Sequence, residues 1–245
     1  MRLWKSWIVA KKDLAVLKRR KMLMASIIAT PVLLGTALPV LVSYVAVRKS
    51  APPSFVAELL ASFSFFFIII SALLPLYISS YGIVGEKVER SLEPLLATPT
   101  SDGEILVGKY ISSFLPMILS IYFGLALFMI LADVMTSHVL GYAFYPSWNI
   151  GIILFIGVPL AIMYGTSFGI FISAKVNNVQ TAYQIGAASL IPFYILYIMG
   201  EANLVSLTTN TNLLIISLGI FIAVLIVYYL SKATFNRERN LTEWK

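Results

Sequence analysis

The sequence predicts an all-α polytopic membrane protein with six transmembrane helices. Three observations predict this fold class. Hydrophobic residues make up 59% of the 245 residues and charged residues only 12%, whereas soluble domains have about 45–50% and about 25%. The apolar residues lie in six long runs that carry no charge. The basic residues lie almost entirely in alternate connecting segments, as the positive-inside rule expects of a membrane protein.

Composition also excludes several classes of protein. The chain has no Cys and a single His, His138. Disulfide frameworks, thiolate metal sites, cysteine nucleophiles and histidine clusters are therefore excluded, and we assign no catalytic, cofactor-binding or metal-ligating residue. Connecting segments reach only about 25 residues, whereas an independent domain needs at least about 50. We expect a single transmembrane domain over residues 1–245.

The first 21 residues have the pattern of an amphipathic helix that lies in the membrane interface. Apolar residues recur near the helical spacing of about 3.6, and lysines occupy other positions. A basic cluster at 18–21 marks where the chain enters the membrane. The helix is either a plain anchor or an elbow helix that also contacts a cytoplasmic partner. The apolar residues are Leu3, Trp4, Trp7, Ile8, Leu14 and Leu17.

Each uncharged run is long enough for a transmembrane helix, which needs about 20 mainly apolar residues. The runs lack the alternation of the roughly ten-residue strands of a membrane β-barrel, so helices are expected. The first run has about 26 residues, longer than the roughly 7–15 of a signal peptide, and is expected to be retained. The predicted spans are 22–47, 59–84, 110–132, 149–173, 181–200 and 212–231.

The charges predict the orientation. Sixteen of the eighteen Lys and Arg residues lie in segments 1–21, 85–109 and 174–180 and in the tail 232–245. Under the positive-inside rule these segments are cytoplasmic, and so are both termini. We expect a multi-pass protein of the cell (cytoplasmic) membrane. The basic balance is therefore an orientation signal and indicates no nucleic-acid partner.

Residues 85–109, between spans two and three, are expected to form more than a simple loop. Pro94 suits the opening of a short helix, and Pro99 its end. Ser101 and Glu104 have the spacing of a capping box, which would start the helix that enters the third span. An apolar stripe at helical spacing precedes it. The stripe consists of Val88, Leu92, Leu95 and Leu96.

Polar and special residues are sparse within the spans. Gly165, Gly169 and Ser173 recur every four residues, which indicates either close helix packing or a mobile interface. Pro75 and Pro192 predict a kink in the second and fifth spans, either static or a gating hinge. In the loop after the third span we expect Asp133 and His138, and assign neither a role.

Three segments resemble the permeases of type-2 ABC exporters. They are Lys11-Lys12-Asp13-Leu14, the run Leu92-Glu93-Pro94-Leu95-Leu96-Ala97-Thr98-Pro99 with Glu86-Lys87 before it, and Glu104-Ile105-Leu106-x-Gly108-Lys109. The six spans, the amphipathic N-terminal arm and the short tail extend the resemblance to the whole chain. It implies that residues 85–109 dock on a separate ATPase subunit.

The resemblance also implies site residues and partners. The partners are two ATPase subunits, a second permease protomer in a homodimer or heterodimer, and membrane lipid. The implied ATPase-coupling residues are Glu86, Glu89, Arg90, Glu93, Leu95, Leu96, Pro99, Glu104 and Lys109. In the family the second and fifth helices of two protomers border the central path, where the candidate substrate residues are Ser64, Ser71, Tyr77, Ser189 and Tyr194.

One motif in this segment is expected to be a coincidence. Residues 103–109 have the spacing of a phosphate-binding loop, but Tyr110 replaces the Ser or Thr that would hold magnesium, and no strand is expected before it. We therefore expect this chain to bind no cofactor. ATP and magnesium are expected on the partner ATPase, which hydrolyses the ATP.

The expected function is that of a permease subunit of an ATP-driven exporter. An ion-driven secondary carrier or a passive channel remains the alternative, although the predicted spans lack the charged residues of proton relays. An intramembrane enzyme would need paired carboxylates, His or Cys in the spans, which are absent from them. A path of hydroxyl and aromatic groups suits a lipid-like, amphiphilic or neutral glycan substrate better than a small polyanion.

Overall fold

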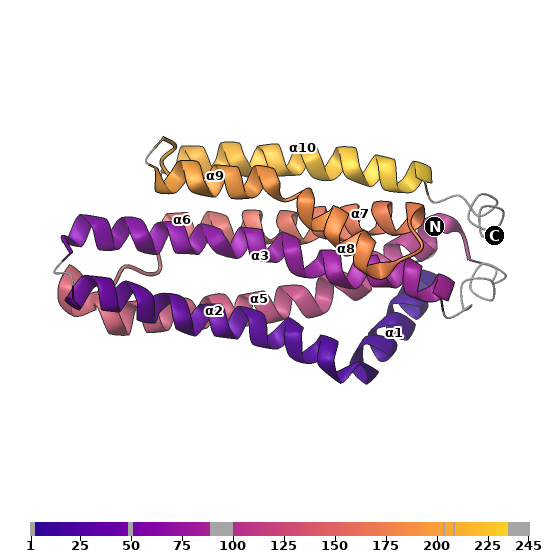
Figure 1. Ribbon diagram of the computed structural model, residues 1–245, viewed down its shortest axis with the longest axis horizontal. Coiled ribbons are helices and arrows are strands. Elements are labelled where there is room, and N and C mark those ends of the chain that lie inside the picture. The colour runs from indigo at the N-terminus through magenta and orange to yellow at the C-terminus, as the bar shows by residue number, and fades with distance from the viewer. Residues whose placement is uncertain (1–2, 49–50, 89–99, 203, 208, 235–245) are drawn as a thin grey trace.

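A computed structural model describes residues 3–48, 51–88, 100–202, 204–207 and 209–234 of the chain. Within them, all regular secondary structure is helical (Figure 1), which confirms the predicted fold class. The elements are α1 (Leu3–Arg19), α2 (Lys21–Arg48), α3 (Pro53–Val88), α5 (Asp102–Leu140), α6 (Trp148–Ile152), the π-helical segment η1 (Ile153–Gly157), α7 (Val158–Lys175), α8 (Val179–Ala188), α9 (Ile191–Glu201) and α10 (Asn210–Thr234).

Among the described residues, six stretches are long and apolar enough to cross a membrane, which confirms the predicted number. They are Lys21–Val47, Pro53–Ser80, Asp102–Leu140, Trp148–Lys175, Val179–Glu201 and Asn210–Lys232. The boundaries differ most for α5, whose 39 residues span about 58 Å against a hydrocarbon core of about 30 Å. A boundary predicted from hydropathy falls at the first charged residue, whereas the backbone hydrogen bonds of the helix continue past that residue. Asp133 and His138 accordingly lie in α5 and not in the loop after it.

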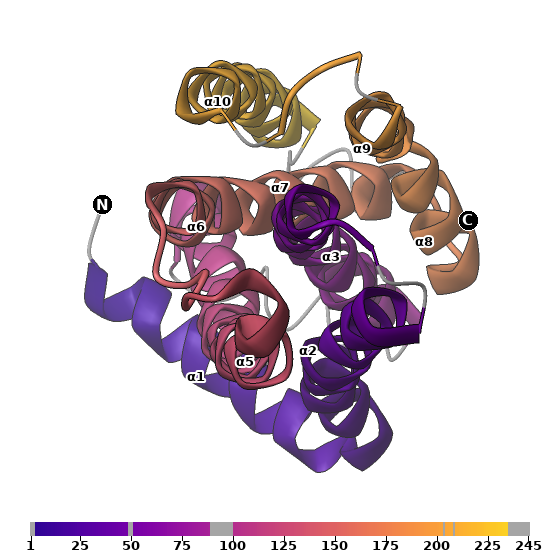
Figure 2. The same cartoon turned by 90° about the vertical axis from the view of Figure 1, so that its left-hand side faces the viewer.

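α3 forms the centre of the bundle. Seen along the bundle axis, α2, α5, α7 and α9 surround it (Figure 2). In its most apolar window 72% of the residues are buried, against 33% for α2 and α5. Phe65, Phe67 and Leu76 of this helix are fully buried. Apolarity alone does not select this position, because lipid tails are as apolar as the side chains, so the central place of α3 reflects its close packing with the neighbouring helices.

α7 packs on α3 through the small residues that the sequence singled out. A Cβ at Gly165 would strike the carbonyl oxygen of Ala72, and one at Gly169 would lie 2.7 Å from the Cβ of Ser79. Ser173 is fully buried. Small residues let two helix backbones approach closely in a membrane. The ladder therefore serves packing within the chain, which was one of the two interpretations.

The two prolines have different effects. Pro75 lies inside the continuous helix α3. Pro192, in contrast, is the second residue of α9, and a turn at 189–190 separates α9 from α8. Proline lacks an N–H and its ring clashes with the preceding helical turn, whereas it fits the first turn of a new helix. The fifth span is therefore two helices joined by a turn and not one kinked helix.

The elements at one end of the bundle form a compact group. α1 crosses this end obliquely and packs against α5, close to where α3 ends and α5 begins (Figure 1). The last turn of α10 lies at the same end. The connections at 51–52 and 141–147 and the described residues 204–207 lie at the opposite end, where α5 stops at Gly141 in the left-handed conformation, with φ of 78°.

Candidate functional site

The predicted coupling segment is described at its two ends. Glu86 lies in the last turn of α3, and residues 100–109 form the start of α5 and the two residues before it. The predicted residues in between lie outside the described part of the chain. They are Glu89, Arg90, Glu93, Leu95, Leu96 and Pro99.

A capping box begins α5, as the sequence predicts. The hydroxyl of Ser101 accepts a hydrogen bond from the N–H of Glu104 at 3.3 Å, and the carboxylate of Glu104 accepts one from the N–H of Ser101 at 3.0 Å. These two bonds satisfy donors that a helix start leaves unpaired, and the carboxylate suits the positive end of the helix dipole. Glu104 is 6% exposed. The structure thus places this predicted coupling residue at the cap of its own helix.

Gly108 lets α1 approach α5 closely. A Cβ on Gly108 would lie 2.8 Å from the carbonyl oxygen of Ser6 and 2.7 Å from the Cβ of Val9. On the α1 side of this contact, Ser6 and Ala10 are fully buried and Val9 nearly so. A side chain at position 108 would separate the two helices, so the residue type sets the distance between them.

A buried ion pair joins the same two helices. The Nζ of Lys109 lies 3.6 Å from the Oδ2 of Asp13, with 4% and 19% of the two side chains exposed. Burying a charge is costly unless it is paired, so the pair favours one placement of α1 on α5. Asp13 and Lys109 come from two of the segments that resemble the exporter permeases. The sequence alone gives no indication that these segments contact one another.

The burial pattern of α1 differs from the predicted interfacial face. Trp4, Trp7 and Ile8 are exposed, as that face requires, but Leu17 is only 7% exposed and belongs to the protein core. The spacing of apolar residues identifies the apolar face of a helix, but it does not show whether lipid or protein covers that face. Part of the predicted lipid-facing side therefore packs against protein.

The resemblance to a phosphate-binding loop has no counterpart in the local structure. α5 begins at Asp102, so residues 103–109 occupy its first two turns, where a phosphate-binding loop would need an open loop before the helix. The ammonium of Lys109 lies against Asp13. Among the described residues there are no strands, and no three His, Asp or Glu side chains are close enough to hold a metal ion.

The candidate path residues do not gather at one place. Ser64 and Ser71 of α3 are 2% and 0% exposed. The hydroxyl of Ser71 donates to the carbonyl of Phe67, and that of Ser64 to the carbonyl of Leu60 at 2.8 Å. Ser64 is also 2.6 Å from the hydroxyl of Tyr145. Both serines therefore lie in the interior of the protomer with their hydroxyl groups engaged.

The other three candidates lie toward the surface. Tyr77 is 42% exposed and Tyr194 38%. The ring of Tyr77 meets that of Tyr183 edge-on, with centroids 5.3 Å apart. The hydroxyl of Ser189 donates to the carbonyl of Gly186 at 2.6 Å, at the break between α8 and α9. Hydropathy and residue spacing did not identify Tyr183, because the sequence of an apolar run does not show which side chains of other helices a tyrosine in it will contact.

Tyr145 is a second residue that sequence reasoning missed. It lies in the loop after α5, where the carboxylate of Asp133 accepts hydrogen bonds from the N–H groups of Phe144 and Tyr145 at 2.9 and 3.0 Å. Its hydroxyl donates to the carbonyl of Leu60 at 3.0 Å. Burial raises the pKa of this hydroxyl, so it stays a neutral donor. The loop is thereby attached to the core of α3.

Comparison with known proteins gives one family. A family model described as ABC-2 family transporter protein matches residues 7–225, from α1 into α10. The match includes both helices of the Asp13 and Lys109 contact and all six candidate spans but for the last residues of α10. No curated protein matches the chain.

Proposed function

This chain belongs to the ABC-2 family of transporter proteins, and from that premise we propose that it is the permease subunit of an ATP-driven exporter. The family and the six apolar helices make it a multi-pass membrane component of a transport system. In the proposal, two ATPase subunits bind a dimer of permease protomers, which are identical or different, at the cytoplasmic face of the cell membrane. Both termini of the chain lie on that face.

One observation carries the coupling part of the proposal: α1 is fixed on the first turns of α5, at the end of the bundle where α3 ends and α5 begins. The Asp13 and Lys109 pair and the close contact at Gly108 hold this junction. α5 then continues without interruption for 39 residues. A displacement at residues 100–109 would therefore pass along α5 to α2 and α3, which pack against it.

The mechanism is a two-state coupling. Binding of nucleotide to the ATPase favours one arrangement of the ATPase pair, and the docked segment transmits this preference to the helices. A ligand shifts such an equilibrium only by its difference in affinity for the two states. ATP and magnesium bind to the partner, which hydrolyses the ATP. The helical start of α5 and the burial of Lys109 support the view that this chain binds no nucleotide.

An ion-driven carrier and a passive channel are the competing functions. Both would transport without an ATPase. Dependence of transport on the co-purifying ATPase separates them from the exporter. Transport that continues when the ATPase is removed would exclude the proposed function.

The docking of the segment can be tested at Leu95 and Leu96. Replacing both with Asp puts carboxylates into an apolar contact, where the loss of an anchor costs about 2 kcal/mol or more of binding free energy. Affinity for the ATPase should fall about thirtyfold, since about 1.4 kcal/mol corresponds to tenfold. The amount of chain in the membrane fraction should not change. The measurement is the ATPase recovered per permease in mild detergent.

A matched control is Thr100→Asp, which adds a carboxylate to the same segment outside the leucine stripe and should leave ATPase recovery unchanged. If the stripe lies on the lipid surface as a second interfacial helix, the double Asp variant retains the ATPase. Normal recovery with that variant would contradict the docking proposal.

A further inference from the structure

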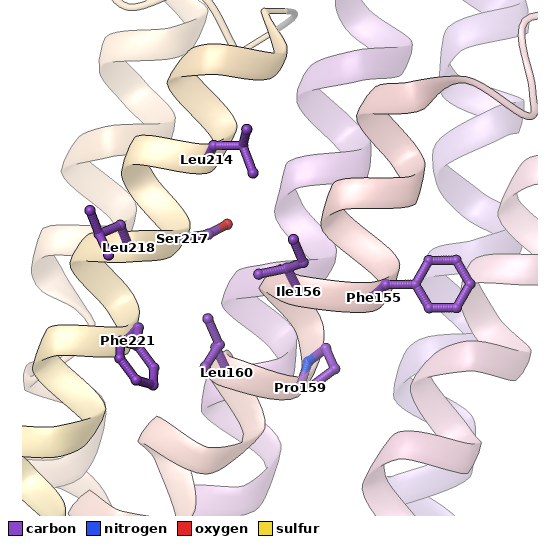
Figure 3. Close-up of a pocket in the computed structure, with 8 residues that line it drawn as sticks. All are labelled: Phe155, Ile156, Pro159, Leu160, Leu214, Ser217, Leu218 and Phe221. Atoms are coloured by element: carbon purple, nitrogen blue, oxygen red, sulfur yellow. The ribbon is translucent and has the colours of Figure 1, made fainter.

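A groove opens on the side of the bundle between η1, the start of α7 and α10 (Figure 3). Its volume is about 430 Å³, within the roughly 300–1,000 Å³ of ligand pockets. All but one of its lining residues are apolar, and the exception is Ser217 of α10. The lining consists of Phe155, Ile156, Pro159, Leu160, Leu214, Ser217, Leu218 and Phe221.

The groove lies at a defined depth in the membrane. Ser217 follows the start of α10 by seven residues, which is about 10 Å along a helix. α10 has 25 residues, or about 38 Å against a hydrocarbon core of about 30 Å, so its first turn lies outside the core. Nearby, Trp148 is 83% exposed at the start of α6, as a residue of the interface is. Ser217 thus lies about one turn inside the hydrocarbon boundary.

The sequence of the fourth span accounts for the groove. Gly157 ends η1 and lies against Ile68 of α3, where an added Cβ would be 2.7 Å from the Cδ1 of Ile68. The missing side chain lets η1 approach α3. The wider turn of a π-helix also changes the direction in which the side chains of α6 and α7, on either side of it, point. The surface that this segment turns toward α10 forms one wall of the groove, and α10 forms the other.

Ser217 is the polar group of this groove, and no partner for it is found in the described part of the chain. It is 3% exposed, and its hydroxyl makes no hydrogen bond to any described residue. Figure 3 shows the hydroxyl directed from α10 across the gap toward Ile156. Several other buried hydroxyls in the described spans, such as those of Ser64, Thr136 and Thr166, donate to the carbonyl four residues earlier, whereas Ser80 shares with Ser217 the lack of a partner. A buried hydroxyl without a partner loses its hydrogen bonds to water without replacement, which is unfavourable.

We propose that this groove binds one acyl chain of a glycerophospholipid from the leaflet at the end of the bundle opposite α1. The hydroxyl of Ser217 donates a hydrogen bond to the ester carbonyl of that chain, and the hydrocarbon lies against Leu160 and Phe221. Ser217 lies about one helical turn, or about 5 Å, below the ester, which sits at the boundary of the hydrocarbon, so an ester carbonyl drawn slightly inward meets its hydroxyl. Lipid surrounds this side of the bundle. The groove is open to the lipid at its rim, where Leu214 and Leu218 are exposed. The site lies on α7 and α10, away from the candidate path on α3, α8 and α9, and does not depend on ATPase coupling.

The test uses the full chain in phosphatidylcholine vesicles that contain a small fraction of phosphatidylcholine with a photoactivatable group in its acyl chain. After irradiation, mass spectrometry locates the adducts. We expect adducts at residues 155–160 and 214–221 to exceed those on the exposed face of α2 at least about tenfold, the factor that corresponds to about 1.4 kcal/mol.

Two neighbouring residues of α10 provide a matched pair of variants. Leu214 lines the groove and is 48% exposed, whereas Ile215 is 62% exposed and does not line it. Leu214→Trp should reduce the adducts in the groove about tenfold, and Ile215→Trp should leave them unchanged. Both positions face lipid, so neither substitution disturbs the core. Adducts that simply follow exposure, with no difference between the two variants, would overturn the proposal.

The role of Ser217 is tested with an ether-linked probe, which has no carbonyl. In the wild type the ester probe should label the groove about fivefold better than the ether probe, as expected for a hydrogen bond of about 1 kcal/mol. Ser217→Ala should abolish this preference. Equal labelling of the wild-type groove by both probes would also overturn the proposal, because the hydroxyl would then not recognise the ester.

Discussion

At the scale of single residues, a polar contact that joins two distant segments of the chain is the pair formed by Asp13 and Lys109. The two partners are not equivalent, because 19% of Asp13 is exposed and only 4% of Lys109. Water can solvate Asp13 in part when its partner is lost. The ammonium of Lys109 has little access to water, so the loss of Asp13 leaves a buried charge.

We therefore predict that Asp13→Asn destabilises the chain by about 3 kcal/mol, the cost of breaking a buried pair. Lys109→Met should cost less, about 1–2 kcal/mol, because the remaining carboxylate is partly hydrated. The double variant should be no less stable than Lys109→Met, since the buried ammonium that Asp13 faces is gone. Denaturant unfolding of the three variants in detergent measures these differences, and additive effects of the two substitutions would contradict the pairing.

At the scale of elements, the contact between α3 and α7 depends on the absence of side chains. The carbonyl of Ala72 occupies the space that a Cβ of Gly165 would need. Any larger residue must push the two helices apart, which reduces the packing of the central helix on its neighbour. In a membrane this packing is the main attraction between helices, because lipid tails are as apolar as the side chains.

Gly165→Ala is accordingly expected to destabilise the bundle by about 1–3 kcal/mol. Gly151→Ala is the matched control within the same span, because a Cβ there meets nothing within 4 Å. The control should be neutral or stabilising by about 0.5–1 kcal/mol, since Ala favours the helix over Gly. Thermal unfolding in detergent compares the two variants. Equal thermal unfolding midpoints for the two variants would contradict the prediction, because the close contact would then contribute nothing to the stability of the bundle.

At the scale of the whole molecule, the two ends of the bundle differ in charge. α1, with Lys5, Lys11, Lys12 and Lys18, lies at the end where α5 starts. From the positive-inside rule we predict that this end lies in the cytoplasm. In this orientation the segment 86–109 would be on the side where ATP is available.

The orientation predicts a labelling pattern. The native chain has no Cys, so each engineered cysteine reports a single position. In intact cells a membrane-impermeant maleimide should label Tyr142→Cys, in the exposed loop after α5, and should leave Ser101→Cys unlabelled until the membrane is permeabilised. Labelling of Ser101→Cys alone in intact cells would reverse the assigned topology.

The sequence by itself determined the features that depend on short stretches of chain. Six uncharged runs predict six spans, because backbone hydrogen bonds can be satisfied in hydrocarbon only within a helix or a closed barrel. The capping box at Ser101 and Glu104 also followed from sequence, because both of its hydrogen bonds lie within four residues. The resemblance to exporter permeases followed from ordered local motifs, and the family match agrees with it.

Only the tertiary structure decided which of these stretches meet. Asp13 and Lys109 are 96 positions apart, and nothing in either segment encodes their contact. Likewise, the candidate path residues Ser64 and Ser71 were chosen because the family resemblance implies that the second helix borders the central path, whereas the packing of α3 at the centre directs both into the interior. The unpartnered hydroxyl of Ser217 has the same origin. Helix periodicity gives each residue a direction, but the neighbour in that direction is set by how the helices pack.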